Sequence, residues 1–320
     1  MKIVFTTYLP KEGFASLSGH NMLMPSADQQ LFSPDELQLM LRDADILVST
    51  FDYKITTEML AEASSLKMIA NFGSGYNNLP IDYCREHNII VTNTPEPVIE
   101  PTAEHAWALL NALAHRVAEL DRRLRMPNYD GIRFGVMQNL GTQLYGKTLG
   151  IIGMGNIGQA LARRAVAGGM RIIYHNRHHL PEKIEKLYNA EYTTLDDLLM
   201  TADIVSLNLP YTPEVRHLMN RDTIGKMKRT AFLLNTARGA HVDEAALVEA
   251  LREKRIAGAA MDVYENEPEI SQGLREMDNV VMSPHIGTGT WEGRIQMCKC
   301  VSTNIQNFIN NNIHLLNSVL

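Results

Sequence analysis

Residues 149–160 read LGIIGMGNIGQA and carry three glycines at the spacing G-x-G-x-x-G. The apolar run before the glycines predicts a buried strand, and the Ala/Leu-rich stretch after them predicts a helix. In such a strand–turn–helix unit the first glycine permits a tight turn, the second lets the backbone approach a pyrophosphate, and the third lets the helix pack on the strand. Unpaired N–H groups at the start of the helix then face the phosphate charge. The stretch predicts a dinucleotide-binding loop made by Gly153, Gly155, Asn156, Ile157 and Gly158.

The loop opens a series of apolar runs separated by helical segments. Such alternation is typical of a parallel α/β sheet. The predicted strands are 149–153, 170–175, 203–208, 231–236, 257–263 and 279–283.

A shorter series of the same kind precedes it, with predicted strands at 2–7, 45–50, 67–71 and 89–93. Ser33-Pro34-Asp35-Glu36 forms a capping box with proline at the first helical position and predicts a helix over 34–42. Longer helices are predicted over 102–120 and 289–310. The pattern predicts a dinucleotide-binding domain over 101–287, inserted into an α/β domain formed by 1–100 and 288–320.

Composition narrows the class of protein. The chain of 320 residues has 45% hydrophobic residues and a formal net charge of -6, with no long Lys/Arg run, which argues against binding nucleic acid. No apolar stretch reaches the ~18 residues of a membrane span, so we expect a cytoplasmic protein without a membrane partner. Three cysteines support neither a disulfide framework nor a metal site.

The second strand of the longer series decides the expected cofactor. It ends in His175-Asn176-Arg177-His178-His179, where an Asp or Glu normally bonds the ribose 2′-hydroxyl of NAD. Asn176 can donate hydrogen bonds, and Arg177 can pair with a 2′-phosphate. The segment favours NADP(H) over NAD(H), although a solvated basic loop would also be compatible with either cofactor.

Three later strands end in chemically active groups. Segments 235–239 (NTARG), 262–268 (DVYENEP) and 283–287 (SPHIG) each follow a strand, and ligands bind at the carboxyl ends of strands in open α/β sheets. They supply a cation that can hold a carboxylate and an acid that can protonate a developing alkoxide. Singly, each residue has a structural explanation, such as a surface ion pair or a turn cap; together the segments offer the groups that hydride transfer to a keto acid needs.

Together with the glycine loop, these segments resemble the D-isomer-specific 2-hydroxyacid dehydrogenase family over nearly the whole chain. The resemblance implies a Rossmann dinucleotide-binding domain inserted into a flavodoxin-like substrate domain, with the active site in the cleft between them. It implies that Arg238 binds the substrate, that His285 donates the proton during reduction, and that Glu267 favours the imidazolium form of His285. It also implies a homodimer, which the apolar helix 102–120 could support.

Further contacts are implied by the same resemblance. The loop 73–78 (GSGYNN) matches the family loop that holds the substrate carboxylate, which places Ser74 and Gly75 at the substrate. Pro80 and the lack of a tryptophan before Gly141 depart from the family pattern and affect the expected substrate shape and dimer contacts. Ser74 stands where the similar phosphite dehydrogenases carry a lysine, which disfavours phosphite. The remaining dinucleotide contacts are expected at Thr102, Pro210, Thr236 and Asp262.

The expected activity is NADPH-linked reduction of a small 2-keto acid, such as glyoxylate or hydroxypyruvate, to the D-2-hydroxy acid. Two alternatives stay open. The same chemistry could act on branched-chain or aromatic 2-keto acids, which pocket volume would discriminate. A dinucleotide-sensing regulatory protein, similar to the corepressors of this fold, could carry the same three residues without turnover.

Overall fold

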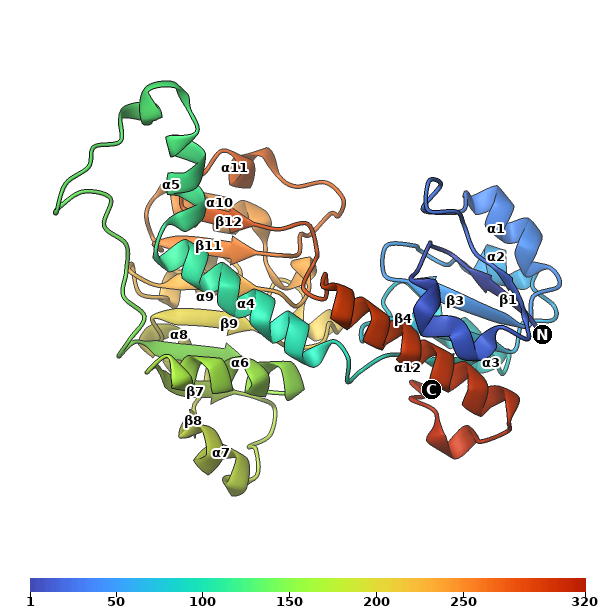
Figure 1. Cartoon of the computed structure of the whole chain (residues 1–320). Helices are drawn as coiled ribbons and strands as arrows, with labels where there is room; N and C mark the ends of the chain where they lie inside the picture. The colour runs from blue at the N-terminus through green and yellow to red at the C-terminus, as the bar shows by residue number, and fades with distance from the viewer. The chain divides into compact units, whose positions relative to one another are not determined.

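The structure, a computed structural model, describes all 320 residues and divides into two compact units. Unit 1 comprises Met1–Pro101 and Thr288–Leu320, and unit 2 comprises Thr102–Gly287 (Figure 1). Each unit contains a single parallel sheet. No helix combines the length and the apolar character needed to cross a membrane.

Unit 1 has a five-stranded sheet in the order β2-β1-β3-β4-β5. This is the flavodoxin-like order. Every residue of β3 and β4 is buried, as expected for parallel strands covered on both faces. The four predicted strands are confirmed, whereas the edge strand β2 was not predicted. The bounds are β1 Lys2–Phe5, β2 Asn21–Leu23, β3 Ile46–Thr50, β4 Met68–Phe72 and β5 Ile90–Thr92.

The helices of unit 1 come from both ends of the chain. The predicted capping box at Ser33 and Glu36 is confirmed and starts α1. The C-terminal helix α12 packs against η1 and β4; Gly13 of η1 leaves no room for a side chain beside Cys298, and Ser16 bonds Ser302 across 2.6 Å. The last helix therefore completes the core of the first hundred residues. The bounds are η1 Lys11–Leu17, α1 Pro34–Leu41, α2 Thr57–Ala61, α3 Ile81–Glu86, α12 Trp291–Ile309 and η5 Ile313–Leu315.

Unit 2 has a seven-stranded parallel sheet in the order β12-β11-β10-β9-β6-β7-β8. Counted from β6, this is the Rossmann order 3-2-1-4-5-6 with one additional strand. The six predicted strands are confirmed, and the edge strand β8 was not predicted. The bounds are β6 Thr148–Ile152, β7 Arg171–His175, β8 Ala190–Tyr192, β9 Ile204–Leu207, β10 Phe232–Asn235, β11 Gly258–Met261 and β12 Val280–Met282.

The prediction of one continuous helix over 102–120 was wrong. Helix α4 spans Ile99–Ala114, Arg116 takes a left-handed conformation with φ 57°, and α5 begins at Val117. The left-handed backbone at Arg116 breaks the helix, and the carbonyl of Ala114 accepts the N–H of Thr142 at 2.7 Å. The later segment therefore supplies a donor to the end of α4.

Of the remaining helices of unit 2, α5 and η2 precede β6, and the others lie between successive strands of the chain. Their bounds are α5 Val117–Leu124, η2 Pro127–Gly131, α6 Asn156–Ala167, α7 Glu182–Tyr188, α8 Leu195–Thr201, η3 Pro213–Val215, α9 Arg221–Lys226, η4 Gly239–His241, α10 Glu244–Arg252 and α11 Gln272–Arg275.

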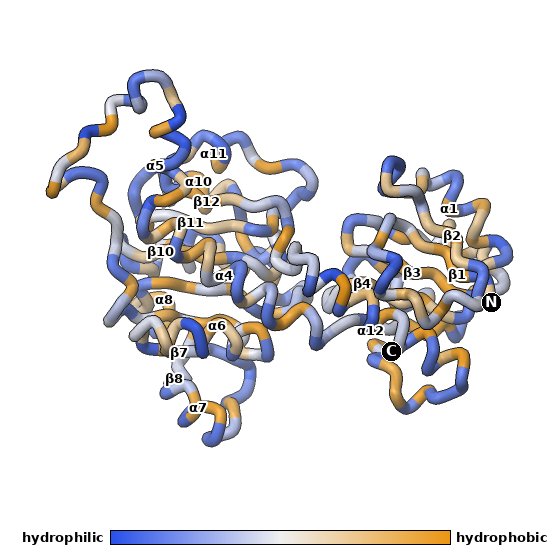
Figure 2. Tube along the Cα trace, viewed as in Figure 1, coloured by the Kyte–Doolittle hydropathy of each residue, from blue (hydrophilic) through white to orange (hydrophobic).

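After α5 the chain projects away from the body of unit 2 as a long loop, here called the strap, residues 126–145, which contains little regular structure (Figure 1). Figure 2 shows apolar stretches along it. Phe134 is 84% exposed, Val136 93% and Met137 74%. Exposed apolar side chains gathered on one segment mark a surface for interaction.

Candidate active site

The three residues predicted to act on the substrate lie at one edge of the unit 2 sheet. Arg238 follows β10, Glu267 follows β11 and His285 follows β12, and these strands are neighbours in the order β10-β11-β12. Because parallel strands end on the same side, their following loops meet. The fold itself therefore gathers a cation, a carboxylate and an imidazole from positions 47 residues apart in the chain (238 to 285).

Glu267 fixes the orientation of the His285 ring. Its Oε2 lies 2.8 Å from Nδ1 of His285, and its Oε1 accepts the backbone N–H of Tyr264 at 2.8 Å. An ionised Glu267 requires the proton on Nδ1 and leaves Nε2 facing away from the carboxylate. This pair can deliver a proton through Nε2 while the charge on the ring is compensated.

Arg238 follows β10 at the same edge of the unit 2 sheet, and its side chain is partly buried. Its Nη1 donates to the carbonyl of Ala237 at 2.6 Å. Burial lowers the pKa of Arg238, and the nearby Glu267 carboxylate opposes that shift. Guanidinium remains charged in proteins, so this position keeps a cation suited to bidentate binding of a carboxylate.

The backbone at His285 is held in a left-handed conformation with φ 53°. A non-glycine residue persists there only where its surroundings determine the turn. The N–H of His285 donates to the Asp262 carbonyl at 2.8 Å, and the Asp262 carboxylate accepts the N–H groups of Ile286 at 2.9 Å and Gly287 at 2.8 Å. The loop that carries His285 is thus wrapped around Asp262.

Each glycine of the predicted dinucleotide loop has its own structural reason. Gly153 has φ 92°, and a Cβ there would stand 2.8 Å from the backbone of Asn208. A Cβ on Gly158 would stand 2.7 Å from the carbonyl oxygen of Gly153. A Cβ on Gly155 would meet nothing within 4 Å, so no packing within the protein requires glycine there. Glycine at this position fits close approach by a phosphate group.

The N-terminus of α6 offers the charge that such a phosphate requires. Asn156 and Ile157 are its first residues, and no side chain caps it. The helix has 12 residues, and unsatisfied N–H groups at its start favour an anion.

Other groups at the same sheet edge also fit a nicotinamide dinucleotide. Two buried oxygens, Oγ1 of Thr236 and Oδ1 of Asn208, have no hydrogen-bond partner in the protein, although buried polar atoms are normally paired. Asn176 accepts the N–H of Met154 at 2.7 Å and so ties the end of β7 to the glycine loop, while Arg177 beside it is exposed. Asn208 was missed by sequence reasoning, because a lone asparagine after a strand has no distinctive pattern.

The predicted substrate loop lies in unit 1 after β4. The carbonyl groups of Gly73 and Gly75 accept hydrogen bonds from the Asn71 side chain, and that of Ser74 accepts one from Asn93 at 2.8 Å. No protein acceptor meets the N–H groups of Ser74 and Gly75. With its carbonyls bound on the protein side, the loop presents N–H groups suited to a carboxylate.

The remaining predicted cofactor contacts are placed as follows. Thr102 is buried, and its methyl group lies 3.4 Å from where a Cβ on Gly287 would stand. Pro210 is exposed three residues after the end of β9. Both carboxylate oxygens of Asp262 already accept protein donors, so its contact with a dinucleotide stays a prediction.

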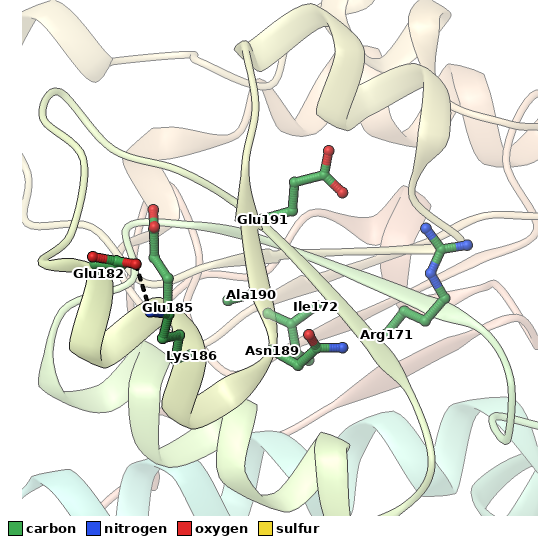
Figure 3. A pocket seen from close by; sticks show the side chains of 8 residues that line it. All are labelled: Arg171, Ile172, Glu182, Glu185, Lys186, Asn189, Ala190 and Glu191. Carbon is green, nitrogen blue, oxygen red and sulfur yellow. Dashed lines mark ion pairs between the residues drawn. The ribbon is translucent and has the colours of Figure 1, made fainter.

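Two cavities differ in their position relative to the candidate site residues: one lies apart from them, and the other lies next to the predicted substrate loop. The cavity in Figure 3, about 370 Å³, lies between α7 and the β7–β8 edge and is lined by charged side chains that include the ion pair of Glu182 with Lys186. It contains none of the candidate site residues. A cavity of about 490 Å³ in unit 1 lies at the carboxyl edge of the sheet, and Phe72, which directly precedes the predicted substrate loop, is among its lining residues. The chain contains no cluster of three or more His, Cys, Asp or Glu side chains that could hold a metal ion.

Comparison with known proteins is consistent with this geometry. Residues 107–287 match the NAD binding domain of the D-isomer specific 2-hydroxyacid dehydrogenases. A glyoxylate reductase of Thermococcus onnurineus is 40% identical over 98% of this chain and 94% of its own length. The crystal structure of a glyoxylate reductase from Paecilomyes thermophila, 31% identical, superposes with a TM-score of 0.88 over 100% of this chain and 98% of that one.

An NADPH-dependent glyoxylate/hydroxypyruvate reductase of Sinorhizobium meliloti is more distant, at 28% identity and a TM-score of 0.82 over 96% of this chain and 94% of that one. Sequence identity of 40% across nearly the whole length exceeds what a shared fold alone would give. The chain therefore belongs to the D-isomer specific 2-hydroxyacid dehydrogenase family and is an NAD(P)-dependent oxidoreductase that acts on 2-keto or 2-hydroxy acids.

Proposed function

We propose that the protein reduces a small 2-keto acid of the glyoxylate or hydroxypyruvate type to the D-2-hydroxy acid. The observation that carries the proposal is the 2.8 Å pair of His285 and Glu267, which follow β12 and β11, at the same sheet edge as Arg238, which follows β10. A proton donor, its counter-charge and a cation for the carboxylate are the groups that carbonyl reduction requires. The glyoxylate reductases among the relatives support this choice of substrate.

In the proposed mechanism, Arg238 binds the substrate carboxylate and polarises the carbonyl oxygen. Ser74 and Gly75 are also proposed as substrate contacts, because the N–H groups of their loop meet no protein acceptor and suit a carboxylate. A reduced nicotinamide ring, when bound, supplies the hydride to the carbonyl carbon. His285 donates the proton from Nε2 to the oxygen, and Glu267 stabilises the imidazolium before that transfer. In the oxidative direction His285 accepts the proton.

We favour NADP(H) as the cofactor. The segment after β7 carries Asn176 and Arg177 and no carboxylate, and Arg177 is exposed and suited to pair with a 2′-phosphate. A carboxylate there would bond the ribose 2′-hydroxyl and repel the phosphate. The NADPH dependence of the Sinorhizobium meliloti relative supports the same choice.

A larger substrate is the second candidate, favoured by the cavity of about 490 Å³ in unit 1. Its walls include Tyr8, Phe51, Phe72 and Trp291. Glyoxylate has no side chain to occupy such a space, whereas an aromatic or branched-chain 2-keto acid would bury apolar surface there. The relative kcat/KM for small and large 2-keto acids separates the two candidates.

The test is steady-state oxidation of NADPH and of NADH with glyoxylate, hydroxypyruvate, 2-ketoisocaproate and phenylpyruvate. We expect NADPH-linked turnover with one of the two small acids, and His285→Ala to lower kcat by about 10²- to 10⁴-fold because the proton donor is lost. His87→Ala, which removes an exposed histidine of unit 1, is the control and should retain full activity. Higher kcat/KM with the two larger acids would favour the second candidate. Absence of turnover with every acid would reject the proposed reduction and favour a dinucleotide-sensing role.

A further inference from the structure

A histidine outside the three predicted residues stands directly behind the His285 loop. Nε2 of His105, on α4, lies 2.8 Å from Oγ of Ser283 and 3.3 Å from Oδ1 of Asp262. The Ser283 hydroxyl lies 2.6 Å from the same Asp262 oxygen. These contacts join α4 to the ends of β11 and β12, all within unit 2.

The direction of this chain of hydrogen bonds follows from the groups themselves. An ionised carboxylate can only accept, so the single hydroxyl proton of Ser283 is donated to Asp262. Oγ of Ser283 must then accept from His105, which requires a proton on Nε2 of that ring. The order is therefore His105 Nε2–H to Ser283 Oγ–H to Asp262 Oδ1.

Asp262 is 1% exposed and depends on these donors. Burial alone would raise the pKa of its carboxyl, but hydrogen bonds from His105, Ser283 and the Ile286 N–H lower it overall. The ionised carboxylate in turn accepts the N–H groups of Ile286 and Gly287, which are the two residues after His285. Through this carboxylate, α4 is coupled to the left-handed turn at His285.

We infer that His105 is a positioning residue for His285: its Nε2–H, acting through Ser283 and Asp262, holds the turn that aims the catalytic imidazole. The inference rests on the proposed role of His285 as proton donor. Groups that face the Asp262 carboxylate are His105 from α4, Tyr264 from the loop after β11, and Ser283 with two N–H groups from the loop after β12. Among these groups, His105 is the one that comes from α4.

The test compares His105→Leu, His105→Gln and Ser283→Ala with His115→Leu, which alters an exposed histidine just beyond the other end of α4. We expect kcat to fall about 10- to 100-fold in His105→Leu and Ser283→Ala, with a far smaller change in KM, because a misplaced imidazole slows the chemical step. The acid limb of the pH–kcat profile should move to higher pH, since Asp262 loses a donor that favours its charged form. His105→Gln should restore most of the rate, because its amide can donate to Ser283.

Hydrogen exchange gives a readout that does not need turnover. The N–H groups of Ile286 and Gly287 should exchange about tenfold faster in His105→Leu than in wild type or His115→Leu. Unchanged exchange in His105→Leu would overturn the inference even if no 2-keto acid is reduced, which separates it from failure of the proposed function. Faster exchange with an unaltered kcat and pH profile would also overturn it, because the turn would then have no effect on His285.

Discussion

His241 shows how one buried residue can make stability depend on pH. The side chain is 0% exposed, and neither ring nitrogen has a hydrogen-bond partner. Burial, opposed by the Pro210 backbone and assisted by the charge of Arg238, lowers its pKa from 6.5 to about 4. Between pH 6.5 and about 4, the His241 ring is neutral in the folded protein but protonated in the unfolded chain.

The sign of the effect follows from these two states. Below pH 6.5 the unfolded chain binds a proton at His241 that the folded protein does not bind until about pH 4. The free energy of unfolding should therefore fall by about 3 kcal/mol as the pH drops through this window and stay constant with respect to this group above it. Denaturant titrations of wild type, His241→Leu and the exposed control His314→Leu measure it. The prediction fails if wild type and His241→Leu lose stability equally between these pH values.

At the scale of elements, two glycines of the dinucleotide loop have different roles: Gly155 leaves space for a ligand, and Gly158 allows close packing. Gly155→Ala should leave the thermal midpoint unchanged, because its Cβ meets nothing within 4 Å, but it should weaken NADPH binding about tenfold by obstructing the phosphate. Gly158→Ala places a Cβ 2.7 Å from the Gly153 carbonyl and should cost about 1 to 3 kcal/mol of stability. Fluorescence titration and thermal unfolding distinguish the two. Equal loss of stability in both variants would contradict the assignment.

Most elements could be predicted because their apolar runs are local. The ten predicted strands were recognised from Val, Ile, Leu and Met in short blocks, whereas β2 and β8 have three residues each at a sheet edge and bury too little to produce such a run. The break between α4 and α5 was not predicted, and the Thr142 N–H that meets the Ala114 carbonyl at this break reaches it only in the folded chain.

The same limit applies to the site. Arg238, Glu267 and His285 occur in recognisable segments, each directly after a strand. His105 was passed over because its partner, Ser283, lies 178 residues away in the sequence. Hydrogen bonds made by packing leave no local pattern, so residues that position others are the ones that sequence reasoning misses.

At the scale of the whole molecule, the exposed strap predicts association. The leucines of α4, Leu109, Leu110 and Leu113, are buried within the protein, so the helix 102–120 offers less apolar surface for a dimer contact than the sequence suggested. Phe134 and Met137 on the strap are instead exposed. We predict a homodimer through this segment, because large exposed apolar surfaces of single chains are usually covered by a partner.

Sedimentation velocity tests this prediction. The double variant Phe134→Ser with Met137→Ser should shift the wild-type dimer toward monomer, whereas Leu187→Ser, which alters a 66% exposed leucine of α7, should not. A monomeric wild type, or a double variant with the wild-type sedimentation coefficient, would reject the strap as the interface.

The place of α12 in the chain has a consequence for synthesis. Unit 2 is one continuous segment, but unit 1 needs α12 from the far end of the sequence, where Met297, Cys298, Val301 and Ile305 are buried. On the ribosome, residues emerge in order and domains fold as units. All of unit 2 is thus released before the sheet of unit 1 receives its last covering helix. Synthesis of unit 1 starts before that of unit 2 and is completed after it, so on the nascent chain the sheet of unit 1 stays without one of its covering helices for longer.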